Sequence, residues 1–491
     1  MLSQHRFYFV TWNVATKNPS QDLNALLDFP SQFDKNKPLP DFYVIGLQEV
    51  KSQPQNMIMD NLFIDPWSSA FNAILCRRNF FMAKNIRLQG MLLLVYTQMK
   101  HLTHLREIEA QYTKTGLGGM WGNKGAVSVR FNIYGCSVCL LNCHLTAHEH
   151  LLADRINDYN TIIKQHTYHV KETTNILYHD YVFWFGDLNF RTDHPSGSSP
   201  TSEEIVAALQ KIEKDKYTSL LKHDQLIAVM KADEAFSEFT EPDIQFPPTY
   251  KFMTGTDEYD LKRKPSWTDR ILNKVIANNY ENLTLRADLI SYHHIPHYTV
   301  SDHKPVVAQY NIKAFANYTE KTVEFAPISR IWYIGDADFR TQCTLSHDVE
   351  INPSDWIGIY DADFHNLDDY IVYEYLAKLS LPHAHSTAGQ PRTITLSFPV
   401  GSGVRTPGFY RFIYFSQPNN DVRSVLGISE PFEVSSKEDK LVSLDNSEPS
   451  PSTSSPAQPG ANTNNSDIFT DFTGLDVAKL SRHFANDLNI D

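Results

Sequence analysis

The stretch FWFGDLNFR, residues 183–191, decides the fold and marks its functional edge. An apolar aromatic run ends at Gly186, and polar side chains then follow at every second position: Asp187, Asn189 and Arg191. Side chains two residues apart lie on the same side of an extended chain. The stretch therefore predicts a buried strand whose end presents a carboxylate, an amide and a guanidinium on one side.

Other apolar runs follow the same plan, because each is of strand length and ends in polar residues. They are RFYFVTWN (6–13), DFYVIGLQE (41–49), GMLLLVYT (90–97), GAVSVRF (125–131), SVCLLNCH (137–144) and YVFWFGDLN (181–189). Their β-branched and aromatic residues are typical of buried strands. Helix-like segments, including 65–79, 148–170 and 201–213, lie between them. This alternation predicts an α+β domain in which helices cover the faces of sheets.

The polar residues recur at the same end of successive strands. Asn13, Glu49, His144 and Asp187 each close an apolar run. Each of them alone has an ordinary explanation, since most polar residues at strand ends only meet water. Four residues that follow one pattern instead predict convergence on one cleft.

The charge is unevenly distributed along the chain. The net charge is −13, but residues 1–320 hold 32 Lys and Arg against 34 Asp and Glu, which gives −2. Residues 321–434 hold 8 against 14, which gives −6. The acidic balance argues against a general binder of polyanions and makes any local basic cluster in the first region informative.

The cysteines and the apolar segments indicate the compartment. Five cysteines form an odd, sparse set, which predicts a reducing environment without a disulfide framework. The N-terminus lacks the features of a signal peptide, and no run approaches about 18 uninterrupted apolar residues. We therefore expect a cytoplasmic protein without a transmembrane segment, in which any membrane contact is peripheral.

The composition changes after Tyr310. Residues 320–434 contain short strand-like pieces separated by turns, which predicts a small antiparallel β-sandwich. Residues 435–466 are rich in Ser, Pro and Asn and are expected to form a disordered linker. Residues 467–491 recover some helical periodicity, and both a partner-binding helix and a frayed tail fit that pattern.

Two later motifs complete a set of chemical groups. PSWTDRIL (265–272) places Asp269 in an apolar setting, and TVSDHKPV (299–306) pairs Asp302 with His303. With the strand-end residues, these motifs supply oxygen donors and no thiolate cluster. A hard ion such as Mg²⁺ prefers such a site.

At this point the motifs resemble a known family. TWNV, GLQEV, GNKGAVSVRF, NCHL, WFGDLNFR, PPTYKF, KRKPSWTDRIL and SDHKPV are similar to those of the inositol polyphosphate 5-phosphatases, over about residues 5–311. The resemblance implies a catalytic domain over 1–315 with the four-layer α/β sandwich of the endonuclease/exonuclease/phosphatase type. It also implies that 320–434 is a SKICH-like domain with an immunoglobulin-like sandwich and that this domain binds a protein partner.

The resemblance implies catalytic roles that the chemistry of each residue supports. Glu49 is the leading Mg²⁺ ligand, assisted by Asn13 and by Asp302 through water. Asp187 orients and deprotonates the attacking water, and Asn189 holds that water or a phosphoryl oxygen.

The histidines would contact the phosphate itself. His144 and His303 would donate hydrogen bonds to the scissile group, and Asp269 would fix the tautomer of His303. Taken alone, Asp269 could be a helix cap and His303 a core histidine; the whole constellation favours the catalytic reading.

Substrate-binding residues are implied in three places. Tyr250, Lys251 and the cluster Lys262, Arg263 and Lys264 correspond to a clamp for the phosphate adjacent to the reactive one. Asn123 and Lys124, in a Gly-rich loop, correspond to contacts with the 1-phosphate, while Leu117, Met120 and Trp121 of that loop suit a membrane surface. His148 is a further candidate contact. Arg191 is assigned to the substrate site too, although a structural partnership with a neighbouring group fits it equally well.

The expected function is therefore Mg²⁺-dependent hydrolysis of the 5-phosphate of phosphatidylinositol 4,5-bisphosphate and 3,4,5-trisphosphate, with soluble inositol 1,4,5-trisphosphate as a further candidate. A DNase-like or abasic-site endonuclease could use the same residues, but the near-neutral domain argues against nucleic acid. A protein that acts mainly as a scaffold through its β-sandwich is the third reading.

Overall fold

The computed structural model describes residues 2–29, 38–51, 65–116, 119–211, 215–277, 284–316, 318–336, 338–347, 349–380, 391–399 and 404–437. Of the expected linker over 435–466, only 435–437 are described, and Ser435 ends a strand. The rest of that linker, the helical tail expected over 467–491 and Leu117 lie outside the described residues.

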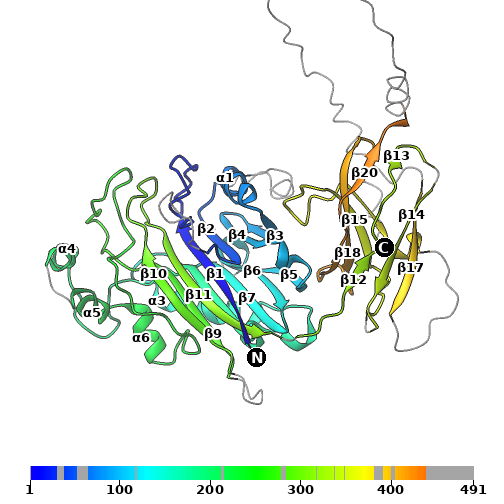
Figure 1. Cartoon of the computed structure of the whole chain (residues 1–491). Coiled ribbons are helices and arrows are strands. Elements are labelled where there is room, and N and C mark those ends of the chain that lie inside the picture. Colours follow the sequence, from blue (N-terminus) through cyan, green and yellow to red (C-terminus); the bar gives the residue numbers. More distant parts are fainter. Residues whose placement is uncertain are drawn as a thin grey trace, which may run out of the picture. The chain divides into compact units, whose positions relative to one another are not determined.

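The N-terminal region contains two β-sheets (Figure 1). The first has the strand order β10-β11-β1-β2-β4-β3 and the second β5-β6-β7-β8-β9. The strands are β1 Leu2–Asn13, β2 Phe42–Gln48, β3 Phe80–Leu88, β4 Met91–Gln98, β5 Leu105–Gly116, β6 Trp121–Ile133, β7 Cys136–His144, β8 Tyr181–Asp187, β9 Asp269–Val275, β10 Ala287–His294 and β11 Val306–Phe315. The helices are α1 Pro66–Leu75, α2 Met99–Leu102, α3 Leu152–Gln165, α4 Ser202–Gln210, α5 Lys216–Leu221 and α6 Gln225–Lys231, with 3-10 turns at Cys76–Arg78, Lys171–Thr173 and Ile176–Tyr178.

The two sheets pack face to face, and helices cover their outer faces. Phe9 of β1 and Phe183 of β8 meet in the shared core, with ring centroids 4.4 Å apart. On the outer face of the first sheet, Trp12 contacts Trp67 of α1. On the outer face of the second, Trp184 contacts Tyr159 of α3. This helix–sheet–sheet–helix order confirms the four-layer sandwich expected from the sequence.

Strand alternation explains why the polar residues end up between the sheets. In β8, Phe183 and Phe185 belong to the inter-sheet core, whereas Val182 and Trp184 belong to the outer one. Asp187 shares the alternation of Phe183 and Phe185, so it continues the inter-sheet layer as the strand ends.

Gly186 is required by the close approach of β7 to β8. Its φ is +141°, and a Cβ built on it would lie 2.0 Å from the carbonyl oxygen of Cys143. The two strands are parallel neighbours here, and Cys143 is the register partner of Gly186. A side chain at this position would therefore push the catalytic end of β8 away from β7.

The C-terminal region is a separate sandwich of two sheets. One has the order β12-β14-β17, and the other β13-β20-β18-β15-β16, with β19 paired to β18. The strands are β12 Val323–Phe325, β13 Trp332–Tyr333, β14 Asp338–Leu345, β15 Trp356–Asp361, β16 Val372–Tyr375, β17 Arg392–Pro399, β18 Gly408–Ser416, β19 Ser424–Ile428 and β20 Phe432–Ser435, and the one-turn helix α7 is Leu376–Leu379. Phe339, Phe398, Phe412 and Phe432 lie in its core. The all-β second region expected from the sequence is confirmed.

The two regions share buried surface. Phe81 of β3 contacts Phe364, with ring centroids 5.2 Å apart. Ile108 of β5 exchanges backbone hydrogen bonds with Arg423. The C-terminal sandwich is thus packed against the N-terminal sheets through apolar contacts, beyond its covalent connection to them. Among the described residues, no helix has the length and apolarity needed to cross a bilayer.

Candidate active site

Three neighbouring strands place their polar ends in one row. His144 of β7 and Asp187 of β8 are parallel register partners. Asp187 and Asp269 of β9 are antiparallel partners. Asn13 ends β1 in the opposite sheet, and Glu49 directly follows β2, which pairs with β1. The predicted convergence of strand ends is therefore present, and both sheets contribute to it.

The amide of Asn13 connects the two sheets. Its Nδ2 donates to Glu49 Oε1 at 3.1 Å and to Asp187 Oδ2 at 3.0 Å. Its Oδ1 accepts from the backbone N–H of Ala15 at 3.0 Å. Asn13 thus holds two carboxylates at one point and is itself oriented by the turn that follows β1.

His303 is held by an acidic partner behind it. Its Nδ1 lies 3.0 Å from Asp269 Oδ2, and its Nε2 lies 3.9 Å from Asp187 Oδ2. The hydroxyls of Thr249 and Thr268 donate to the same Asp269 oxygen at 2.7 and 2.9 Å. All these side chains are buried, so the orientation of His303 is fixed by the hydrogen bond between its Nδ1 and an Asp269 carboxylate that two hydroxyls hold in place.

His144 faces the same point from the other side. Its Nε2 is 3.4 Å from Asp187 Oδ2 and 3.9 Å from Glu49 Oε1. Lys124 Nζ lies 2.5 Å from this nitrogen. Lys124, which the family resemblance assigns to the 1-phosphate, therefore lies beside His144 and adds a cation to the cluster.

The charges in the cluster set its protonation states. Burial lowers the pKa of His303, but Asp269, Asp187 and Asp302 outweigh it and raise the pKa to about 9. Burial and the nearby Lys124 lower the pKa of His144. Burial would raise the pKa of Asp187, yet His303 and His144 hold this pKa well below its usual range. At neutral pH the site thus contains an ionised Asp187 beside a protonated His303.

Two residues of the site have left-handed backbone conformations. The φ of Glu49 is +55° and that of Asn189 is +58°. Side chains other than glycine adopt this region at a cost of about 1–2 kcal/mol. The turn at Asn189 is held by its N–H donating to Asp187 Oδ1 and its Nδ2 donating to the carbonyl of Leu145. Strain of this kind is characteristic of functional sites.

A basic pocket lies next to the carboxylates. It is lined by Ala147, His148, Glu149, Arg191, Tyr250, Lys251, Arg263 and Lys264. The Arg191 guanidinium lies over the Tyr250 ring, 4.7 Å from its centroid, and donates to the backbone and side-chain oxygens of Asn189. The Tyr250 ring in turn lies 4.4 Å from the His303 ring. The pocket is therefore continuous with the catalytic cluster through Tyr250 and Arg191.

The remaining predicted residues lie around this pocket. Asp302 Oδ2 lies 3.4 Å from Lys251 Nζ, so the two side chains form an ion pair. Asn123 is exposed and its side chain lies against Gly116. Lys262 is exposed, and it is not among the residues that line the pocket. Of the residues predicted to form the clamp, Tyr250, Lys251, Arg263 and Lys264 line the pocket.

Several partners could not be recognised from the sequence. Lys264 Nζ is held by Glu149 Oε1 at 2.8 Å and by Asp193 Oδ1 at 2.7 Å, from segments 115 and 71 residues away in the chain. Thr268 precedes Asp269 directly within the PSWTDRIL motif. Thr249 belongs to the PPTYKF motif, so a sequence signal was present for both threonines.

The donor atoms fit a hard divalent cation. Glu49 is a carboxylate with 42% of its side chain exposed, next to the amide of Asn13. That amide presents Nδ2 to the two carboxylates and Oδ1 to the Ala15 N–H, so it would ligate a cation through oxygen only after a half-turn that gives up the Ala15 hydrogen bond. Oxygen ligands that keep access to water are what Mg²⁺ requires. We find no thiolate near this point among the described residues, since the described cysteines other than Cys76 are buried in cores.

Comparison with known proteins matches both regions. The endonuclease/exonuclease/phosphatase family 2 matches residues 10–309, and the SKICH domain matches residues 323–434. Inositol polyphosphate 5-phosphatase K of Mus musculus is 32% identical over 87% of this chain and 89% of its own length. Phosphatidylinositol 4,5-bisphosphate 5-phosphatase A of Mus musculus is 35% identical over 88% of this chain, which spans only 42% of that relative.

A solved structure resembles the N-terminal region. It is the inositol polyphosphate 5-phosphatase domain of SPsynaptojanin in complex with inositol (1,4)-bisphosphate and calcium ion. The sequences are 30% identical, the TM-score is 0.53, and the match covers 64% of this chain and 86% of that one.

Proposed function

The chain belongs to the endonuclease/exonuclease/phosphatase family 2 and, within it, to the inositol polyphosphate 5-phosphatases, and we propose that it hydrolyses the 5-phosphate of phosphoinositides in a Mg²⁺-dependent reaction. It is a phosphoric monoester hydrolase that carries a SKICH domain, and it resembles inositol polyphosphate 5-phosphatase K over most of both chains. The observation that carries the proposal is the convergence of Glu49, Asp187 and His303 on one point beside a basic pocket.

The metal would be held by Glu49, with the Asn13 amide oxygen and Asp302, through water, as supporting ligands. When bound, Mg²⁺ supplies charge neutralisation on the scissile phosphate. Calcium in the related crystal structure supports a divalent-cation site. The ion pair between Asp302 and Lys251 gives Asp302 a second task, which is to position a residue of the pocket.

Asp187 would orient the attacking water and accept its proton. Its ionised state at neutral pH makes it a hydrogen-bond acceptor for water, and its low pKa favours orientation in the ground state over early proton removal. Asn189 would hold the water or a phosphoryl oxygen. The reaction is then an in-line displacement that depends on positioning and electrostatics.

The cationic groups would bind the phosphoryl oxygens. His303 is protonated at neutral pH and donates through Nε2, while Nδ1 remains on Asp269. His144 and Lys124 approach from the opposite side. The developing negative charge of the transition state is therefore met by donors that the fold has already oriented.

The pocket would bind the neighbouring phosphate of the inositol ring. Lys251, Arg263 and Lys264 offer cations there, with Tyr250, Arg191 and His148 beside them. We assign phosphatidylinositol 4,5-bisphosphate and 3,4,5-trisphosphate as substrates, and soluble inositol 1,4,5-trisphosphate as a further candidate. Met120 and Trp121 are 81% and 53% exposed beyond Lys124, which supports contact with a lipid surface. We expect the protein at cytoplasmic membrane faces, with the SKICH domain binding a protein partner.

The test is phosphate release from a panel of inositides with and without Mg²⁺. We expect release from 5-phosphorylated members only, and loss of release by a factor of about 10³ in Asp187→Ala. Activity that survives in this variant would remove Asp187 from the mechanism. Nicking of plasmid DNA without phosphate release would instead favour an endonuclease, and absence of both activities in a folded, Mg²⁺-supplied chain would favour a scaffold.

A further inference from the structure

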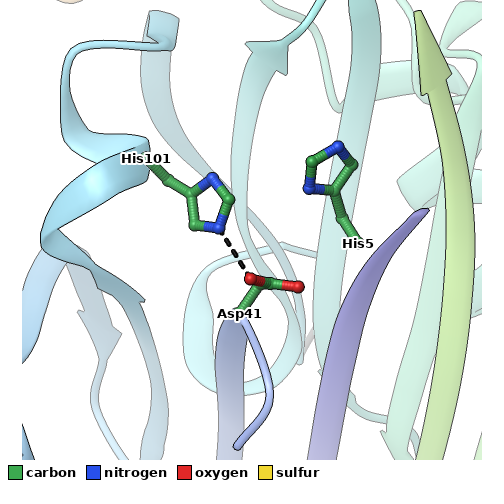
Figure 2. A group of neighbouring side chains, drawn as sticks. All are labelled: His5, Asp41 and His101. Carbon is green, nitrogen blue, oxygen red and sulfur yellow. Dashed lines mark hydrogen bonds and ion pairs between the residues drawn. The ribbon is translucent and has the colours of Figure 1, made fainter. Parts of the chain in front are cut away.

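A second group of ligand-type side chains lies at the opposite end of the first sheet. It consists of His5 near the start of β1, Asp41 just before β2, and His101 in α2. One potential ligand atom from each lies within 4.8 Å of the others (Figure 2). Asn13, at the catalytic end of β1, is eight residues from His5, which is roughly 26 Å along a strand. The group is therefore separate from the catalytic cluster.

One ring nitrogen of His5, Nε2, has a hydrogen-bond partner, and the other, Nδ1, is the candidate ligand atom. Ser3 Oγ lies 2.8 Å from His5 Nε2 and 3.3 Å from the carbonyl of Ala314, to which it donates. This arrangement suits the neutral ring with its proton on Nε2, and in that tautomer Nδ1 carries a lone pair. This nitrogen faces Asp41 and His101 in Figure 2, and we find no hydrogen-bond partner for it among the described residues. His5 is only 8% exposed, so most of its side chain is shielded from solvent.

His101 is arranged in the same way. Its Nε2 lies 2.8 Å from Asp41 Oδ1, and its Nδ1 lies 2.9 Å from the hydroxyl of Tyr134. A tyrosine hydroxyl can donate or accept, so it also satisfies the tautomer of His101 that carries its proton on Nδ1, and in that tautomer Nε2 has a free lone pair. Histidines that bind metals characteristically place their other nitrogen on such a partner. The Tyr134 ring also stacks on His5, with centroids 4.6 Å apart, and helps to orient it.

Asp41 is the anionic member. Its Oδ2 accepts from the backbone N–H of Arg6 at 2.9 Å, which fixes the carboxylate. Its Oδ1 faces His101 and also accepts from Lys100 Nζ at 2.7 Å. The Lys100 side chain is 60% exposed, so it can move into water and leave Oδ1 to another cation.

We propose that His5 Nδ1, Asp41 Oδ1 and His101 Nε2 form a binding site for a zinc-type divalent ion, with water as the fourth ligand. Two imidazoles and one carboxylate suit zinc and its late first-row neighbours better than Mg²⁺. Ligands of a tetrahedral ion with bonds of about 2.0–2.1 Å lie roughly 3.3 Å apart, so small side-chain rotations close the site. The ion would tie together β1, the start of β2 and α2, and so stabilise the sheet end that is remote from catalysis.

The test uses Co²⁺ as a spectroscopic probe on the full chain in saturating Mg²⁺, which occupies the catalytic site. We expect one equivalent to give the visible absorption of a four-coordinate ion, and Zn²⁺ to displace it. The band should be lost in His5→Gln and His101→Gln and retained in His104→Gln, a nearby histidine bound to Glu320 instead. No band in the native chain, an unchanged band in His5→Gln, or a thiolate charge-transfer band that assigns the ion to a cysteine would overturn the proposal.

A second variant leaves the three proposed ligands in place and should raise the affinity for Co²⁺ instead of lowering it. Lys100→Met removes the ammonium that competes for Asp41, so Co²⁺ should bind more tightly, on the order of fivefold. Phosphate release should stay within about twofold of the native rate, because the site is remote from Asp187. Zn²⁺ should raise the unfolding midpoint of this variant and of the native chain. Equal or weaker Co²⁺ binding by Lys100→Met would refute the site even if the histidine variants failed to fold.

Discussion

At the scale of single residues, the central atom of the active site is Asp187 Oδ2. It accepts from Asn13 and lies within 4 Å of nitrogens of both His144 and His303. A buried carboxylate in this position is stable only because it is surrounded by donors and cations. The histidines among these neighbours lower the pKa of Asp187. The carboxylate is therefore a weaker base than an ordinary aspartate, but its orientation is fixed.

The pairing of His303 with Asp269 predicts a pH effect. His303 has a pKa of about 9 in the folded chain against 6.5 for the ordinary side chain, and Asp269 is the largest charge raising it. Activity that needs the imidazolium is therefore retained through neutral pH and lost as pH rises through 9. In Asp269→Asn this alkaline limb of kcat should move to lower pH.

The pairing of His303 with Asp269 also stabilises the folded chain, and the raised pKa of His303 determines at which pH this stabilisation is lost. The contribution is complete below pH 6.5 and disappears as pH rises through 9, because the folded state binds the proton more tightly than the unfolded state. Urea unfolding of the native chain and Asp269→Asn at pH 6 and pH 9.5 should show a difference that shrinks at the higher pH. If the two chains differed by the same unfolding free energy at both pH values, Asp269 would stabilise the fold without its charge interaction with His303.

Lys264 predicts an effect on substrate binding. Replacing it with Met removes a cation from the pocket and leaves Glu149 and Asp193 without their partner, so a phosphate should be bound less well. We expect KM for a 4,5-bisphosphorylated inositide to rise about tenfold with a smaller change in kcat. Lys262→Met is the matched control, because Lys262 is exposed, lies two residues from Lys264 and does not line the pocket. Equal effects of the two substitutions would show that only the general charge of the segment matters.

At the scale of secondary structure, the strands β7, β8 and β9 form the catalytic row through their register. His144, Asp187 and Asp269 are side by side because each ends or begins its strand at the same level of the sheet. The row depends on the close approach of β7 and β8, which Gly186 permits.

Gly186→Ala should therefore be strongly destabilising. The added Cβ meets the carbonyl of Cys143 at 2.0 Å, and we expect a loss of about 3 kcal/mol or more in the free energy of unfolding. Gly335→Ala is the control, since its φ is also positive at +83° and nothing lies within 4 Å of its added Cβ. That substitution should cost roughly 1–2 kcal/mol from backbone conformation alone. If urea unfolding showed similar losses of unfolding free energy in Gly186→Ala and Gly335→Ala, the steric explanation for Gly186 would be wrong.

Sequence patterns predict this level of structure well. Apolar runs that end in Asn13, His144 and Asp187 identify both the strands and the edge at which they meet, since alternation and strand length are local properties. The partners of Lys264 are set by packing between distant segments, whereas Lys124 meets His144 through the register of the β6–β7 hairpin, in which Gly125 pairs with His144. Packing between distant segments also brings together His5, Asp41 and His101, none of which belongs to a motif.

At the scale of the whole molecule, the two regions of the described chain are joined by more than a peptide connection. The sequence suggests two modules with a boundary near residue 320, and the sheets do divide there. Buried contacts nevertheless cross the boundary, through Phe81 with Phe364 and Ile108 with Arg423. Arg106 also donates to the carbonyl of Lys321 at 2.9 Å.

A chain shortened to residues 2–316 should therefore be less stable than the full chain. Removal of the sandwich exposes apolar residues of β3 and β5, so the unfolding midpoint should fall and binding of a hydrophobic dye should rise. Hydrolysis of soluble inositol trisphosphate per folded molecule should persist, because the catalytic cluster ends at His303. An unchanged midpoint without dye binding would show that the shared surface contributes no stability.

The alternation in β8 has a consequence for how this protein can vary in length. Phe183, Phe185 and Asp187 face the inter-sheet layer at every second position, so inserting or deleting one residue before Asp187 would turn the aromatic rings and the carboxylate to the opposite side together. Changes of one residue should thus be absent inside this strand in functional descendants of the chain. Length variation should instead accumulate in the connections, where an added residue leaves the facing of every strand unchanged.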